Sequence, residues 1–152
     1  MALAGALALP RPGRGQTRTI TLAVPDLAAS FADSGNIAHL TAALISDDLR
    51  GTSQFAPLDS SALTAAAATG IASSGLPQFE VWHAAGVDAL VTGTINLSAE
   101  KFKFEFHLWD IQSGQQLAGH QYIGQPDDWQ LIAHNFSSHI YERLTGGKRD
   151  FG

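Results

Sequence analysis

The sequence predicts an α/β domain with a mixed five-stranded sheet packed by helices. Three patterns predict it: a β-branched segment followed by an amphipathic helix, a strictly alternating segment joined to a second strand by a Ser-Gly turn, and a final helix with an apolar stripe. The 152 residues are enough for one domain with a substantial core and too few for two ordinary domains.

The first part of the chain predicts a strand, a helix and a short extended segment. Residues 19–24 are β-branched and apolar, and a proline follows them, which predicts a strand. Capping groups at residues 34–36 and a glycine at position 51 delimit a predicted helix. One face of that helix carries an apolar stripe: Ile37, Leu40, Leu44, Ile45 and Leu49. Residues 55–59 predict an extended piece, which Pro57 confines to a sheet edge or strand end.

The middle of the chain is less regular. Residues 60–75 are low in complexity and contain an alanine run, so they predict one weak helical turn followed by a mobile Ser/Gly loop. Residues 77–85 predict a short helix with a proline in its first turn and a glycine at its end. Residues 87–97 begin apolar on both faces, which is typical of a central strand covered by helices on both sides.

The strongest periodicity lies in residues 101–108. One face carries Phe102, Phe104, Phe106 and Leu108, and the other carries Lys101, Lys103, Glu105 and His107. The Ser113-Gly114 turn joins this strand to residues 116–123, which predicts an antiparallel hairpin with one solvent-facing side. On this pattern His107 is an ordinary surface or boundary residue.

The last helix is predicted to begin at Asp127 and Asp128, because carboxylates favour the positive end of a helix dipole. Its apolar stripe comprises Trp129, Ile132, Ala133, Phe136, Ile140 and Leu144, and two glycines end it. The five residues after those glycines match no upstream element. They resemble the start of a connection to a further segment.

The charge distribution excludes nucleic acid as an expected partner. Three of the nine basic residues lie within the first 18 positions, whereas all 14 acidic residues lie after them, so residues 19–152 carry six basic and 14 acidic residues, a net charge of −8. Such a body repels phosphate backbones and offers no basic stripe.

No recognisable catalytic, cofactor or metal motif is present. The absence of cysteine excludes disulfides, thiolate zinc sites and a cysteine nucleophile. There is no nucleophile elbow, no phosphate-binding loop and no glycine cluster after the first strand. His134 and His139 are five residues apart on a helix and diverge. We expect Asp47 and Asp48 to lie on a solvated helix face. The sequence therefore predicts neither an enzyme nor a cofactor or metal site.

Two tryptophans, at positions 82 and 129, lie on apolar stripes and are expected in the core. Trp109 differs, because the strict alternation places it on the polar face of its strand. An exposed aromatic residue there could anchor a partner protein. The alternative is that Trp109 is covered at the end of its strand by a loop.

The start of the chain resembles the back half of a secretory signal. Residues 1–9 form an apolar run, and a segment rich in proline, glycine and arginine follows. Nine residues cannot span a bilayer, so we expect no membrane insertion. The alternative is a flexible alanine-rich terminus. In either case residues 1–16 are expected to form a signal-peptide remnant or a disordered arm.

Four segments taken together resemble the N-terminal domain of the TolB family in its alphaproteobacterial form. They are ITLAVPDL at 20–27, ISDDLRGTSQFAPLD at 45–59, GVDALVTGTI at 86–95 with FEFHLWDIQSGQQLAGHQY at 104–122, and DDWQLIAHNFSSHIYERLTGGKRDF at 127–151. The resemblance implies a fold similar to anticodon-binding domains over residues 17–146. It also implies that residues 147–152 begin a linker to a β-propeller that is missing here.

The resemblance further implies a periplasmic component of the Tol-Pal system without enzyme activity, which supports outer-membrane integrity and envelope constriction at cell division. A TolA-like protein would bind the leading segment, and Pal would bind only the missing propeller. Many family members have an additional extended strand in that leading segment. Here only Gln16, Thr17, Arg18 and Thr19 remain, so these four residues and Trp109 are the partner-binding candidates.

A different class of function stays open. The domain could instead be a small ligand-binding or enzymatic α/β domain in which the segment from Ser60 to Gly75 acts as a lid loop. A pocket lined by polar groups beneath that loop would favour this alternative, and a filled apolar junction would count against it.

Overall fold

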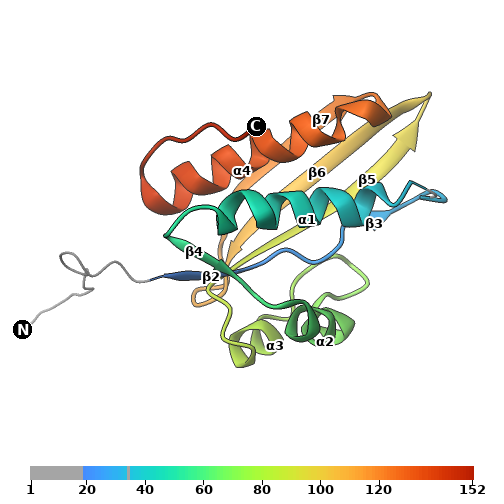
Figure 1. Cartoon of the computed structure of the whole chain (residues 1–152). Helices are drawn as coiled ribbons and strands as arrows, with labels where there is room; N and C mark the ends of the chain where they lie inside the picture. The colour runs from blue at the N-terminus through green and yellow to red at the C-terminus, as the bar shows by residue number, and fades with distance from the viewer. Residues whose placement is uncertain (1–18, 34) are drawn as a thin grey trace, which may run out of the picture.

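A computed structural model describes residues 19–33 and 35–152, and it has the predicted α/β architecture (Figure 1). Its elements, in chain order, are β2 (Ile20–Ala23), β3 (Ala28–Ala29), α1 (Ile37–Arg50), β4 (Phe55–Pro57), α2 (Ser60–Gly70), α3 (Phe79–Ala84), β5 (Ala89–Ser98), β6 (Lys101–Asp110), β7 (Gln116–Gly124), η2 (Pro126–Asp128) and α4 (Trp129–Thr145).

The sheet is mixed, as the sequence predicts. Its strand order is β4-β2-β5-β6-β7. The first three of these strands are parallel to one another, and β5, β6 and β7 are antiparallel neighbours. A two-residue strand that the sequence did not predict, β3, pairs in parallel with β5 farther along that strand. Pro57 ends the edge strand β4, where its missing N–H breaks no ladder.

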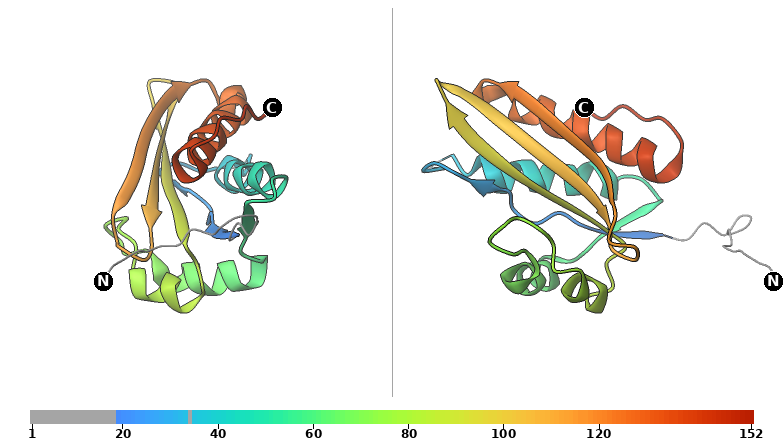
Figure 2. Two further views of the ribbon diagram at one scale, coloured as in Figure 1. Left: turned by 90° about the vertical axis from the view of Figure 1, so that its left-hand side faces the viewer. Right: turned by 180° about the vertical axis from the view of Figure 1, so that it is seen from behind.

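One face of the sheet carries the main core. Helices α1 and α4 lie side by side on this face (Figure 2). The alternating phenylalanines of β6 point toward them, and Phe106 stacks on Phe136 of α4 with ring centroids 4.6 Å apart. Phe104, Phe106 and Phe136 are all fully buried. The alternating face of β6 and the apolar stripe of α4, each predicted from the sequence, therefore pack against one another.

The opposite face is covered only at one end. Helices α2 and α3 pack there in a second apolar cluster with Leu90 and Trp109. Trp82 of α3 is fully buried, and its indole N–H donates to the carbonyl of Gly70 at 2.8 Å. Farther along the same face, Ile123 of β7 is 64% exposed. The expectation that helices cover both faces of the central strand β5 is thus met only near its start.

Residues 60–70 form an eleven-residue helix, α2, so the prediction of only one weak helical turn was wrong. The residues that follow, 71–76, are not helical. Alanine has the highest helix propensity, and Asp59 caps the first turn by accepting from the Ala62 N–H at 3.0 Å. That hydrogen bond, and a second from Ser61, lower the pKa of Asp59. Beyond the helix, Ile71 pairs with Pro77 in a bridge, so Pro77 lies before α3 and not in its first turn.

The cap of α1 also differs from the prediction. Asn36 is the N-cap residue but makes no side-chain cap hydrogen bond. Asp33 caps the helix in its place, because its two carboxylate oxygens accept from the backbone N–H groups of Ile37 and Ala38, each at 2.8 Å. A carboxylate at this position also stabilises the helix, because its negative charge lies at the positive end of the helix dipole.

The C-terminal residues return along α4 instead of leaving the domain (Figure 1). Phe151 packs against the main core, and its ring meets that of Tyr141 edge-on with centroids 6.2 Å apart. The reading of residues 148–152 as unrelated to any upstream element was therefore wrong. That they begin a linker stays a prediction.

Candidate functional site

A pocket opens on the partly covered face of the sheet, beside the cluster formed by α2 and α3. Strands β5 and β6 form its floor, residues 26–28 form one wall, and residues 71–76 lie over it. We name it the β5–β6 pocket. Its volume is about 270 Å³. Because a β-strand sends alternate side chains to opposite faces, the polar face of the predicted hairpin is the one that faces this pocket. Two of its four predicted members, Glu105 and His107, line it.

The polar lining of the β5–β6 pocket is more acidic than basic. Asp26 and Glu105 each contribute a carboxylate, and no lysine or arginine of the described residues lines it. Asp26 Oδ1 lies 2.8 Å from His39 Nδ1, which partly neutralises that carboxylate when His39 is protonated. Within the described ranges, 19–33 and 35–152, Glu105 has no ion-pair partner. Glu105 is therefore the free anionic group of the pocket.

His107 is the unexplained polar group of the pocket. Its Nδ1 atom is buried and has no hydrogen-bond partner among the described residues. A buried polar atom usually has a partner, so an orphan of this kind calls for a physical explanation. Its cross-strand neighbours, Thr92 on β5 and Gly119 on β7, leave this nitrogen free. The sequence reading of His107 as an ordinary boundary residue missed this feature.

Trp109 is buried and is not the exposed partner anchor that the strand alternation allowed. Its residue exposure is 9%. The indole N–H donates to Thr92 Oγ1 at 3.0 Å, and Phe79 of α3 packs edge-on against the ring with centroids 5.8 Å apart. The alternative prediction, that Trp109 is covered at the end of its strand, is the one that the structure supports. The covering element is helix α3 and not the expected loop. Trp109 is also one of the residues that line the pocket.

The other partner-binding candidates lie at the start of the described chain. Gln16, Thr17 and Arg18 lie outside the described residues. Thr19 is exposed and directly precedes β2. It is not among the residues that line the β5–β6 pocket. The structure thus does not bring Thr19 and Trp109 together into one site.

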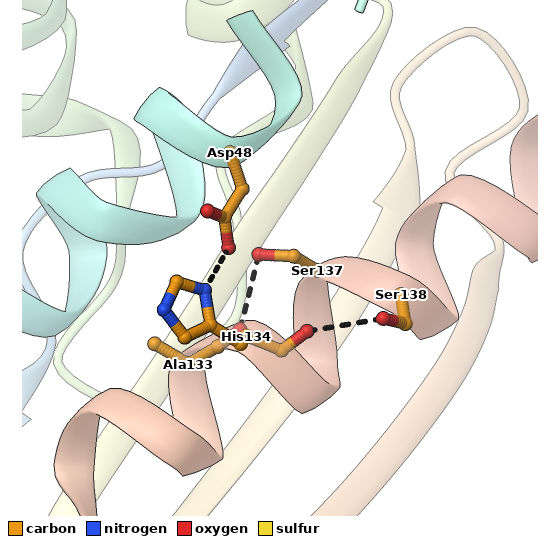
Figure 3. Close-up of polar contacts among 5 residues, drawn as sticks. All are labelled: Asp48, Ala133, His134, Ser137 and Ser138. Atoms are coloured by element: carbon orange, nitrogen blue, oxygen red, sulfur yellow. Dashed lines mark hydrogen bonds and ion pairs between the residues drawn. The ribbon is translucent and has the colours of Figure 1, made fainter. Parts of the chain in front are cut away.

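A second polar feature joins α1 to α4. Asp48 Oδ2 lies 2.8 Å from His134 Nδ1, and the two side chains are 10% and 23% exposed, respectively. Figure 3 shows the pair pointing toward one another across the helix interface. The expectation of a solvated face was therefore wrong for Asp48. Asp47 is exposed and pairs with Arg50, one turn away on the same helix.

A third feature is a histidine pair between β7 and α4. The rings of His120 and His139 stack with centroids 4.0 Å apart. Burial, and secondly the charge of His139, lower the pKa of His120. Glu142 and Arg143 lie in the same shallow surface depression. The described residues contain no group of three or more histidine, aspartate or glutamate side chains placed to hold a metal ion.

The described helices include none that is long and apolar enough to cross a membrane. Within the described ranges, the geometry so far shows an α/β domain with a small acidic pocket, a partly buried Asp48–His134 pair and a stacked pair of histidines. None of the hydroxyl groups in the described part of the β5–β6 pocket is hydrogen-bonded to His107 or Glu105. A nucleophile with its base in place, the arrangement that acyl-transfer chemistry requires, is thus not found among the described residues of this pocket.

Sequence comparison then places the domain within a known class. The profile of the TolB amino-terminal domain matches residues 13–117. The chain therefore belongs to the TolB amino-terminal domain family, in agreement with the resemblance of the four segments. The match covers strands β2 to β6 and the first residues of β7, and so includes both strands that form the floor of the pocket.

Solved structures of the same fold agree. TolB from Acinetobacter baumannii superposes with a TM-score of 0.66 at 21% identity, over 88% of this chain and 30% of that protein. The hypothetical protein CT253 from Chlamydia trachomatis gives a TM-score of 0.56 at 11% identity, over 86% of this chain and 97% of that one. The LpoB C-terminal domain from Salmonella enterica gives a TM-score of 0.50 at 14% identity, over 73% of this chain and 86% of that one. The chain thus spans about a third of the TolB protein that it matches.

Proposed function

We propose that this chain is a periplasmic protein-interaction domain of a TolB-like component of the Tol-Pal system. The observation that carries the proposal is the family membership over residues 13–117. The absence of a recognised catalytic motif in the sequence is consistent with a binding role. On this proposal the domain supports outer-membrane integrity and envelope constriction at cell division and performs no catalysis itself.

A TolA-like protein is the proposed partner of the leading segment, Gln16 to Thr19. The exposed position of Thr19 before β2 supports this assignment, because a segment that precedes a strand of an open sheet is accessible from solvent. Pal is assigned only to a propeller that lies outside this chain. Residues 147–152 are proposed to lead toward that propeller.

The test is co-purification with the C-terminal domain of TolA. The full chain is compared with a variant that lacks residues 1–19, which removes the proposed contact and leaves intact every strand of the described residues. We expect a complex with the full chain and at least about a tenfold loss of affinity in the variant, since interface energy is concentrated in a few residues. A variant with Arg143→Ala, in the last turn of α4, is the control. No complex with either chain would refute the assigned partner.

A second candidate function is a ligand-binding domain with the segment from Ser60 to Gly75 over the site. The β5–β6 pocket favours it, because polar groups line a cavity beneath residues 71–76. The volume limits this candidate. Pockets for drug-sized molecules and cofactors measure about 300–1,000 Å³, and about 270 Å³ lies just below that range. A nucleotide or similar cofactor is therefore too large, and a group the size of one side chain fits.

A further inference from the structure

The β5–β6 pocket is suited to a single cationic side chain. Glu105 supplies a carboxylate without an ion-pair partner among the described residues, Asp26 supplies a second, and no described lysine or arginine lines the cavity. The surrounding body, residues 19–152, carries a net charge of −8. Charge complementarity of this kind selects a basic partner and accelerates its approach.

The apolar lining completes the match to a long basic side chain. Ile71 and Leu76 belong to residues 71–76, which lie over the pocket. Leu76 is 57% exposed although it is a large apolar residue. Arginine has an alkyl stem that packs on apolar surface and a charged head that reaches carboxylates. Its guanidinium forms two parallel hydrogen bonds to one carboxylate, which an ammonium group cannot do.

His107 lies next to Glu105 in the lining of the pocket. The two residues are two positions apart on β6 and so lie on the same face. The Nδ1 atom of His107 is buried and is not exposed to the cavity, so Glu105 and the apolar lining hold the occupant.

We propose that the β5–β6 pocket binds one arginine side chain of a partner protein. The proposal rests on the interaction role proposed above, but Thr19, the described residue of the leading segment, does not line the pocket, and the two proposals are tested with different ligands. The two experiments are therefore independent. The result with the truncated chain does not decide whether the pocket binds arginine, and a pocket that does not bind arginine would not change the result with the truncated chain.

The test uses the full chain, labelled with ¹⁵N, and acetyl-arginine N-methylamide as the probe. We expect concentration-dependent shifts of the Trp109 indole N–H signal and of the Thr94 amide signal. The matched control probe is acetyl-citrulline N-methylamide, which has the same shape without the charge. Arginine should bind at least about fivefold more tightly, because charge-assisted hydrogen bonds are about twice as strong as neutral ones. Equal binding of both probes would overturn the proposal.

Two variants locate the binding. Glu105→Gln keeps the size of the side chain and should weaken probe binding at least about fivefold, whereas Glu142→Gln on α4 should not change it. Thr94→Lys places a cation directly across from Glu105 in the β5–β6 ladder, so it should fill the site and abolish the Trp109 shift. Unchanged binding in Glu105→Gln or Thr94→Lys would overturn the proposal, as would the absence of shifts up to about 20 mM probe.

Discussion

Asp48 of α1 and His134 of α4 form the only ion pair between these helices in the described part of the chain, with 2.8 Å between Oδ2 and Nδ1. The two residues are 86 positions apart in sequence, so the pair fixes a contact between distant segments. Ser137 and Ser138 follow on α4, where each hydroxyl donates to the backbone carbonyl four residues earlier (Figure 3). Their hydroxyls are thus satisfied within α4, and Asp48 and His134 make the polar link across the interface.

The first prediction concerns this ion pair. We expect Asp48→Ala to lower the free energy of unfolding by about 1–3 kcal/mol, because it leaves the His134 nitrogen without its partner in a mostly buried position. The neighbouring Asp47→Ala is the matched control and should change it by less than about 0.5 kcal/mol, since Asp47 is exposed. Urea unfolding of both variants measures the difference. Equal losses of stability in Asp48→Ala and Asp47→Ala would contradict the stabilising role of the Asp48–His134 pair. A double-mutant cycle of Asp48→Ala with His134→Ala would then show no coupling energy.

The second prediction concerns Gly70, the last residue of α2. Replacing a helical glycine by alanine usually stabilises a protein by about 0.5–1 kcal/mol. Here a Cβ atom would lie 2.6 Å from the indole nitrogen of Trp82. Trp82 is fully buried and cannot move aside, so we expect Gly70→Ala to lower the melting temperature.

The control for Gly70 is Gly147→Ala. A Cβ atom at position 147 meets only ordinary contacts, the nearest at 3.5 Å. Thermal unfolding followed by circular dichroism should therefore show a clear decrease for Gly70→Ala and no decrease for Gly147→Ala. A rise in melting temperature for Gly70→Ala would mean that α2 and α3 pack more loosely than described.

The periodic segments of the chain could be predicted from sequence because their pattern coincides with their burial. The phenylalanines of β6 alternate and all face the core, and the stripe of α4 faces them. Helix α2 was missed because its hydrophobic signal is weak: only Ala66 and Gly70 of its residues are buried. The Asp59 cap, alanine propensity and packing against α3 stabilise this helix. The low complexity of the segment concealed the first two, and the third is a tertiary contact.

The candidate site could be predicted only in part. The alternation of residues 101–108 placed Glu105 and His107 on one face, and this was correct. The pocket itself needs residues 26–28 and 71–76, which tertiary packing brings to the same strands. Strand β3 has only two residues, too few for any periodic signal. Trp109 was assigned to the polar face correctly. Its burial, however, depends on packing by α3, and the alternation of residues along a strand carries no information about such tertiary contacts.

The third prediction concerns the stacked pair His120 and His139. Because burial and the charge of His139 lower the pKa of His120 in the folded state, the unfolded chain binds the proton more readily. The contribution of His120 to stability is therefore fully present above its unfolded pKa of about 6.5. It is lost as the pH falls from there toward the lower folded pKa.

Unfolding free energies measured between about pH 8 and pH 5 test this prediction, because the interval spans the unfolded pKa of histidine. We expect the slope of stability against pH to become shallower in His120→Gln. His83→Gln is the control, since His83 is exposed on α3, and its slope should match that of the unaltered chain. An unchanged slope in His120→Gln would contradict the lowered pKa.

The last prediction concerns the C-terminal segment, which the sequence left without a partner. Phe151 packs against Tyr141, and the Arg149 guanidinium carbon lies 5.4 Å from the Phe151 ring centroid. Since the ring is only partly buried, Phe151→Ala should lower the free energy of unfolding by about 1–2 kcal/mol. Lys148→Ala is the control and should cause no measurable change, because its ion pair with Glu142 is exposed. Denaturant unfolding compares the two. If Phe151→Ala had no effect, the segment would not dock on α4 in solution, and residues 147–152 would act as a free linker.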